Sequence, residues 1–187
     1  MNAYNFDILI LVNHGVVIGA DSRDEVLELL LNVEERLFKP MRDVSSFLDI
    51  RKLKFIIKSS KYKFPKYDFC HKLAMDKICQ DILSKSPLYP DHVIFLGPGP
   101  IPVVSEDEFN SKLSKYIDET NIKVVVIKNV GVIIHEDLSD NGEEMLYCLT
   151  SVLLKIDDHN DLKHLSKLEE MQLLGWDAEK YRKKIER

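Results

Sequence analysis

The sequence has no long hydrophobic run and few cysteines, and each absence excludes a class of protein. The longest clean apolar stretch, residues 8–12, is far shorter than the ~18 residues that a membrane-spanning helix needs. The 3 cysteines are an odd number without the spacing of a metal knuckle, which is typical of reduced thiols. The N-terminus has neither a basic region nor a small-residue cleavage site, so we expect no signal peptide. We therefore expect a cytoplasmic chain that does not bind membranes.

Glycine and proline are also sparse, at 7 residues each, and no glycine- and serine-rich linker interrupts the chain. The 187 residues have the length of one domain or of two very small ones. Because no linker is recognisable, we expect a single domain over residues 1–187, long enough to bury a sizeable core.

Positive charge is concentrated in one stretch of an acidic chain. The whole sequence has a net charge of -5, which argues against a general binder of polyanions. Residues 51–72 hold eight bases and one acid, a net charge of +7, with aromatic side chains between them. A solvated basic face is the favoured interpretation, because Ile50, Leu53 and Ile57 have the spacing of a core-facing helical stripe. The alternative is a surface that binds an anion or a partner protein, and nucleic acid is the disfavoured ligand. The candidate binding residues are Lys52, Lys58, Lys61, Lys63 and Lys66.

Strands alternate with helices along the chain, which predicts an α/β fold. The first expected helix begins with Ser22 and Glu25 at the spacing of a capping box. Pairs of serine and glutamate with the same spacing begin at Ser105 and Ser166. Expected helices cover residues 23–38, 47–59, 65–84, 105–117, 140–156, 162–174 and 176–182. Expected strands cover residues 7–12, 16–19, 92–96, 122–127 and 132–134. Residues 103–104 are expected to begin or end a short extended piece.

A strand, an N-x-G turn, a second strand and a helix occur twice in this order, over about residues 7–39 and 122–157. An offset of 116 residues places Asn13 on Asn129 and Gly15 on Gly131. The short connections favour antiparallel pairing within each copy. The copies differ at the middle of the turn, where His14 corresponds to Val130. We interpret the pattern as an internal repeat.

Residues 8–22, with N-H-G between two apolar strands, resemble the class II aldolase/adducin superfamily. Its motif continues with a glycine, here Gly19, and a helix, which here contains Glu34. Residues 90–104 are similar to a segment of longer, rhamnulose-phosphate-aldolase-like members. Those members also carry a second unit of strand, x-x-G and strand, so the resemblance covers most of the chain.

The resemblance implies a fold, an activity and a cofactor. The fold would be an αβα sandwich around a mainly antiparallel or mixed central sheet. The activity would be the lyase reaction of a class II aldolase, cleavage of a sugar phosphate with Zn²⁺ as the Lewis acid. The zinc ligands of the family are an H-x-H pair and the histidine of N-H-G, so the one metal ligand that carries over is His14. No catalytic residue carries over.

The H-x-H pair has no counterpart in these 187 residues. The acid/base glutamate and the phosphate-binding loops of the family also precede the matched strand. We therefore expect a second chain, or a missing N-terminal half, to complete the zinc site. The chain is then part of a split enzyme, a fragment of a longer protein, or a relative that has lost catalysis. The remaining histidines form no compact ligand set: His71, His92, His135, His159 and His164.

The alternative function is a non-catalytic, adducin-like module for binding or assembly. Both functions imply association, either as a homo-oligomer or with a second chain. A sugar phosphate is the expected small-molecule partner of the enzyme.

Overall fold

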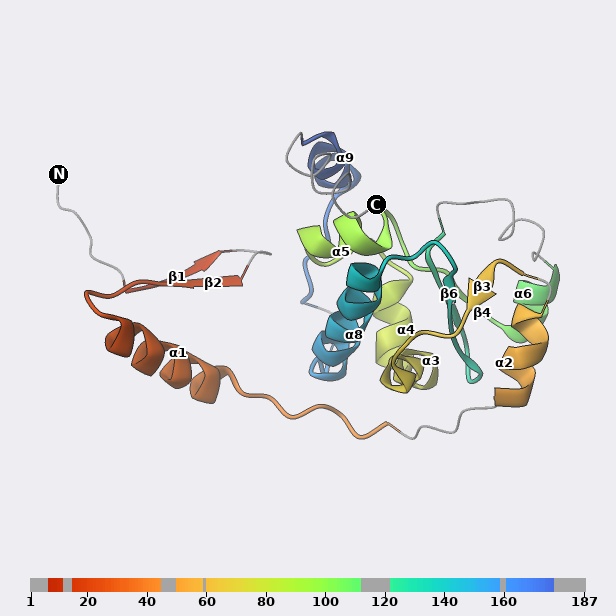
Figure 1. Ribbon diagram of the computed structural model, residues 1–187, viewed down its shortest axis with the longest axis horizontal. Coiled ribbons are helices and arrows are strands. Elements are labelled where there is room, and N and C mark those ends of the chain that lie inside the picture. The colour runs from red at the N-terminus through yellow and green to blue at the C-terminus, as the bar shows by residue number, and fades with distance from the viewer. Residues whose placement is uncertain are drawn as a thin grey trace. The chain divides into compact units, whose positions relative to one another are not determined.

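The computed structural model describes residues 7–11, 15–44, 50–58, 60–111, 122–158 and 161–176. The chain divides into two compact units, Met1–Pro40 and Met41–Arg187. In the described residues eight α-helices and one 3₁₀ helix accompany a two-stranded hairpin and a mixed four-stranded sheet, as the predicted α/β class requires (Figure 1). None of the helices described is long and apolar enough to cross a membrane.

The first unit consists of a hairpin and one helix. Strands β1 (Ile8–Leu11) and β2 (Gly15–Ile18) pair antiparallel, and helix α1 (Arg23–Leu37) follows. The predicted capping box of α1 is confirmed, because Ser22 and Glu25 each accept a hydrogen bond from the backbone of the other. No residue of α1 is buried.

The second unit is built on four strands in the order β3-β6-β5-β4. The central pair, β5 (Val124–Ile127) and β6 (Gly131–His135), is antiparallel and buried throughout. Strand β3 (Tyr62–Lys63) extends the sheet antiparallel to β6, and β4 (Val103–Val104) lies parallel to β5.

Helices cover both faces of this sheet. Side chains of alternate residues in β5 and β6 pack into one core with α3, α4 and α8, and the others pack into a second core with α2 and α6 (Figure 1). Helix α5 packs against α8 and α9. The helices of this unit are α2 (Ile50–Ile57), the 3₁₀ helix η1 (Asp68–His71), α3 (Lys72–Met75), α4 (Lys77–Leu83), α5 (Pro90–Leu96), α6 (Glu106–Ser111), α8 (Asp140–Leu154) and α9 (Lys167–Gly175).

The hairpins of the two units have the same register. Leu11 pairs with Gly15 as Ile127 pairs with Gly131, an offset of 116 residues on both strands. The backbone bond from Gly19 N to Asp7 O, at 2.9 Å, also recurs 116 residues later, from His135 N to Lys123 O, at 2.8 Å.

Two predicted elements are wrong. Residues 92–96 form part of helix α5 rather than a strand, because Pro90 occupies the first turn and its fixed φ favours a helix start. The predicted helix over residues 65–84 is divided into η1, α3 and α4. It breaks at Asp76, whose extended backbone caps α4 while its side chain accepts a hydrogen bond from Cys79 N. The predicted helical residues 47–49, 112–117 and 177–182 lie outside the described residues.

Candidate functional site

The predicted metal ligand, His14, lies outside the described residues. In the described part of the chain no group of three or more His, Cys, Asp or Glu side chains could hold a metal ion. These residues therefore do not fit a zinc site by themselves, and we derive no catalytic step through zinc. The role of His14 stays a prediction.

Two buried histidines are engaged with the backbone. His71 Nδ1 accepts a hydrogen bond from Val132 N at 3.0 Å, and burial lowers the pKa of this imidazole. His135 Nδ1 accepts from Asp137 N at 3.2 Å, and burial is again the main cause of a lowered pKa. A neutral imidazole is the form that can accept these bonds. Both side chains therefore stabilise the fold.

The other two described histidines lie near each other beside α5. His164 Nδ1 contacts the carbonyl oxygen of Ser86. Neither ring nitrogen of His92 has a hydrogen-bond partner among the described residues. Burial, and then the proximity of His164, lowers the pKa of His92 to about 4. His92 is therefore neutral at pH 7 and lies in the interior.

The predicted basic surface is partly neutralised by carboxylates. Lys52 Nζ lies 3.1 Å from Glu106 Oε2, and both side chains are exposed. Lys63 Nζ lies 2.9 Å from Oε1 of the buried Glu143. These pairs fasten α2 and β3 to neighbouring helices, so their lysines also have a structural role.

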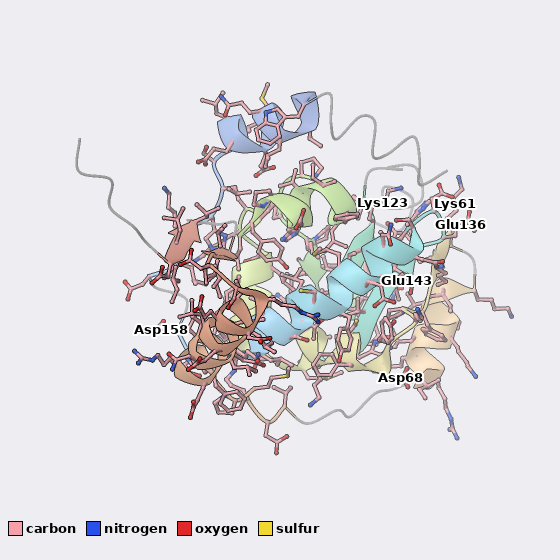
Figure 2. All side chains as sticks on the ribbon, turned by 60° about the vertical axis from the view of Figure 1, so that its left-hand side comes forward. Lys61, Asp68, Lys123, Glu136, Glu143 and Asp158 are labelled. Atoms are coloured by element: carbon pink, nitrogen blue, oxygen red, sulfur yellow. The ribbon has the colours of Figure 1, made fainter. Side chains whose placement is uncertain are left out.

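The remaining three candidate lysines are exposed. Lys66 Nζ lies 2.9 Å from Glu144 Oε1 and 4.9 Å from the ring centroid of Tyr67. Lys61 lies near Lys123 and the end of β6 (Figure 2), and Lys58 follows α2. The structure thus spreads the five lysines over several elements, and anion binding by them stays a prediction.

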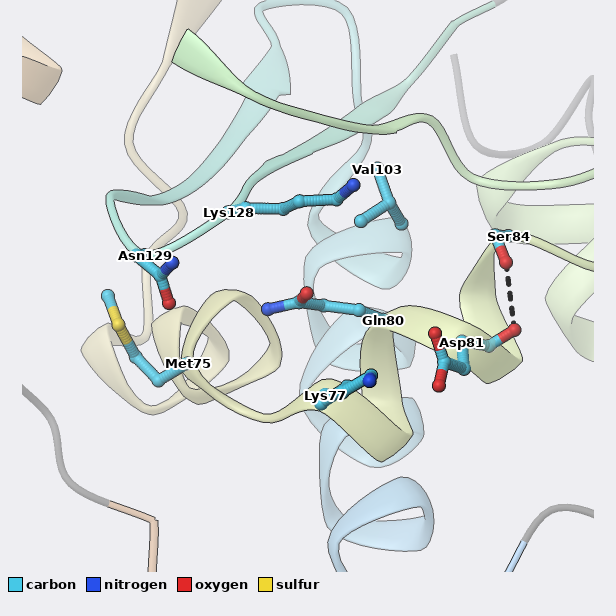
Figure 3. Close-up of a pocket in the computed structure, with 8 residues that line it drawn as sticks. All are labelled: Met75, Lys77, Gln80, Asp81, Ser84, Val103, Lys128 and Asn129. Atoms are coloured by element: carbon cyan, nitrogen blue, oxygen red, sulfur yellow. Dashed lines mark hydrogen bonds between the residues drawn. The ribbon is translucent and has the colours of Figure 1, made fainter.

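A pocket that the sequence analysis did not find lies between α4 and the turn after β5. Its volume is about 430 Å³. Four polar residues of α4 and its C-cap, at positions i, i+3, i+4 and i+7, face it, while the apolar residues between them are directed to the core. We call it the α4 pocket, and it is lined by Met75, Lys77, Gln80, Asp81, Ser84, Val103, Lys128 and Asn129 (Figure 3).

Backbone and side-chain hydrogen bonds fix the walls of the α4 pocket. Asn129 has the left-handed backbone conformation, with φ of 57°, and its N donates to Ala74 O at 2.9 Å. Gln80 Nε2 donates to the same carbonyl oxygen at 2.7 Å. Ser84 Oγ donates to Asp81 O at 2.8 Å (Figure 3). Hydrogen bonds therefore hold both walls of the α4 pocket in place.

The sequence carries one local signal for this pocket. Lys77, Gln80, Asp81 and Ser84 form a polar stripe with helical spacing. The facing residues could not be predicted, because they depend on the parallel pairing of β4 with β5.

The first unit has an acidic pocket of about 460 Å³ between the start of β1 and α1. Its carboxylates are Asp7, Asp21, Glu25 and Glu28, of which Glu25 belongs to the capping box. Nothing in the described residues points to a ligand there beyond this concentration of acids.

Comparison with models of protein families, with curated proteins and with solved structures gives no match for this chain.

Proposed function

We propose that this chain is a component of a class II aldolase-like, zinc-dependent sugar-phosphate lyase. In this proposal another polypeptide supplies the H-x-H pair and the acid/base carboxylate, and the complete fold is an αβα sandwich. The observation that supports it is the common register of the two hairpins, of which the first carries N-H-G, with its glycine as the first residue of β2.

The two hairpins differ in what covers them. In the second unit β3 and β4 pair with both edges and helices cover both faces, so that Val126 is 0% exposed. The equivalent Ile10 in the first unit is 69% exposed, and every residue of β1 is exposed. A hairpin with one helix is marginally stable by itself, because it buries little apolar surface. A first unit of this kind fits a protein in which the surface of another polypeptide covers the exposed hairpin.

The chemistry proposed for this chain is limited to one ligand. A neutral imidazole at His14 would donate one nitrogen to zinc, and three protein ligands with an open position are usual in catalytic zinc sites. One imidazole does not make such a site. The isolated chain should therefore neither hold zinc nor cleave a sugar phosphate.

A non-catalytic binding or assembly module is the second candidate, and α2 is the observation that favours it. Phe55 is 77% exposed on this helix, next to the exposed Lys54 and close to Lys58. An exposed aromatic ring among basic side chains fits the surface of a partner that is acidic and partly apolar. In this alternative the chain keeps the fold of the superfamily, binds a partner through this surface and has no lyase activity.

The test compares the isolated chain with the complex that it forms in its native cell. Zinc per protomer is measured by elemental analysis, and cleavage of phosphorylated ketoses is measured by release of dihydroxyacetone phosphate. We expect well under one zinc per isolated chain, and zinc with activity in the complex. His14→Ala should remove both from the complex, whereas the matched control His159→Ala should leave both unchanged.

Two results would decide against the proposal. Full zinc occupancy of the isolated chain would contradict a divided metal site. A complex that has no activity, and whose composition is the same with His14→Ala, would favour the non-catalytic module.

A further inference from the structure

We propose that the α4 pocket binds a small organic phosphate that carries hydroxyl groups. The inference does not rest on the proposed lyase function. Every residue that lines this pocket belongs to the second unit, and none belongs to the hairpin that carries His14.

The α4 pocket lies at the carboxyl end of the parallel strand pair of the sheet. Strands β4 and β5 are parallel, with Val103 beside Val126, so their carboxyl ends meet at one edge. Lys128 follows β5 at this edge, and its N donates to Val104 O at 2.9 Å. Ligands of open α/β sheets bind outside the carboxyl ends of the parallel strands. The α4 pocket opens at this place.

Two lysines give the α4 pocket positive charge. Lys77 on α4 and Lys128 on the opposite wall are exposed and line the same pocket (Figure 3). Neither ammonium group makes an ion pair with any of the described residues, in contrast to Lys52, Lys63 and Lys66. Lysine binds phosphate as a point charge. Two such lysines match the two charges of a phosphate monoester.

The remaining polar side chains of the α4 pocket fit hydroxyl groups of a ligand. Asp81 supplies a carboxylate that accepts hydrogen bonds, and it would repel a second anionic group on the ligand. Gln80 uses its amide nitrogen on Ala74 O, which leaves its side-chain oxygen with acceptor capacity. Ser84 donates to a backbone carbonyl, so its oxygen can also accept. These acceptors suit a polyol, whereas inorganic phosphate has fewer hydroxyl groups to donate to them.

The size and rigidity of the pocket agree with such a ligand. A volume of about 430 Å³ lies in the range of small-molecule sites, roughly 300–1,000 Å³. Both walls are fastened to Ala74 O, one through Asn129 N and the other through Gln80 Nε2. Because the walls are already held in place, little ordering should oppose binding.

The experiment titrates the full chain with three probes, followed by protein NMR and by isothermal calorimetry. The probes are glycerol 3-phosphate, inorganic phosphate and glycerol. We expect saturable binding of glycerol 3-phosphate, binding of inorganic phosphate that is at least about fivefold weaker, and no binding of glycerol. Shifts of amide signals should centre on residues 77–84 and 128–129.

Variants of exposed residues identify the groups that bind. Lys77→Ala and Lys128→Ala should each weaken glycerol 3-phosphate binding about fivefold or more, because each removes one charged partner. Lys58→Ala removes an exposed lysine outside the pocket and should leave the affinity unchanged. Asp81→Asn should strengthen inorganic phosphate more than glycerol 3-phosphate, because it removes a repulsive charge and weakens the acceptor for hydroxyl groups.

Three outcomes would overturn the inference. One is the absence of saturable binding of glycerol 3-phosphate. Another is binding that neither pocket lysine variant weakens more than Lys58→Ala does. Equal affinity for inorganic phosphate and glycerol 3-phosphate would refute the part of the inference that concerns hydroxyl groups.

Discussion

Acidification should destabilise the protein through His92, a residue of α5 that is 3% exposed. Burial, and secondarily the charge of His164, lowers its pKa from 6.5 to about 4. A histidine with a lower pKa in the folded state takes up its proton more readily after unfolding, so falling pH favours the unfolded chain. Above pH 6.5 the ring is neutral in both the folded and the unfolded state, so His92 does not lower the free energy of unfolding. As the pH falls from 6.5 toward 4, the free energy of unfolding decreases.

The magnitude follows from these two pKa values. Linkage predicts that this group alone removes about 2 kcal/mol of unfolding free energy between pH 7 and pH 5. Most carboxylates contribute little in this interval, because their ordinary pKa values lie below it. Burial also lowers the pKa of His71 and of His135, and both act in the same direction. Substitution of His92 is therefore needed to separate its contribution to the loss of unfolding free energy from theirs.

Urea unfolding followed by circular dichroism at pH 7, 6 and 5 measures this share. Neither nitrogen of His92 has a partner among the described residues, so His92→Phe and His92→Leu remove no hydrogen bond seen there. Both variants should keep most of the stability at pH 7. Each should lose about 2 kcal/mol less than the wild type on going to pH 5. The same pH dependence in the wild type and in both variants would refute the reasoning.

Two further predictions concern the stability of the second unit, measured by urea titration at pH 7. Arg42→Ala should lower the free energy of unfolding by about 2–3 kcal/mol, because it removes bonds of 2.8 and 3.2 Å to the half-buried carboxylate of Asp76. Arg42→Lys should recover only part of the lost free energy of unfolding. Full recovery would show that the two-pronged bond of the guanidinium to Asp76 is unimportant. Gly142→Ala should lower the free energy of unfolding by about 1–3 kcal/mol, because the new Cβ would lie 2.5 Å from Leu138 Cδ1. The control Gly175→Ala meets no atom within 4 Å, and an equal loss there would argue against a steric cause.

Local signals in the sequence predicted those elements whose determinants lie within a few residues. The serines at 22, 105 and 166 each form the predicted pair of bonds with a glutamate three residues later. Helix α1 was predicted over 23–38 and spans Arg23–Leu37. Capping bonds and helical periodicity depend on neighbours in the sequence, which is why they can be recognised there.

Other elements could not be predicted from periodicity. The apolar run at 92–96 fits a strand as well as a buried helix. Pro90 in the first turn is the local signal for the helix, and packing against α8 and α9 accompanies the helical form. Strand β3 has two residues, too few for a periodicity, whereas β4, of the same length, was expected as a short extended piece at 103–104. They are strands because β6 and β5 offer them an edge for pairing.

The same limit applies to the candidate sites. The acidic partners of Lys52 and Lys63 come from α6 and α8, far along the chain, so the sequence could not show which bases are paired. The α4 pocket needs a helix and a turn that are separated by more than forty residues of sequence. The ligand role of His14 stays a prediction, based on the resemblance of its motif.

The beginning of the second unit is fastened to its own core. Arg42 N donates to Leu154 O at 2.8 Å, its guanidinium reaches Leu153 O at 3.1 Å, and Val44 is buried. Residues 41–44 therefore belong to the compact unit that holds the four-stranded sheet. A gene fragment that starts at Met41 would preserve these contacts, so that crystallisation and ligand soaking could be carried out without the preceding forty residues.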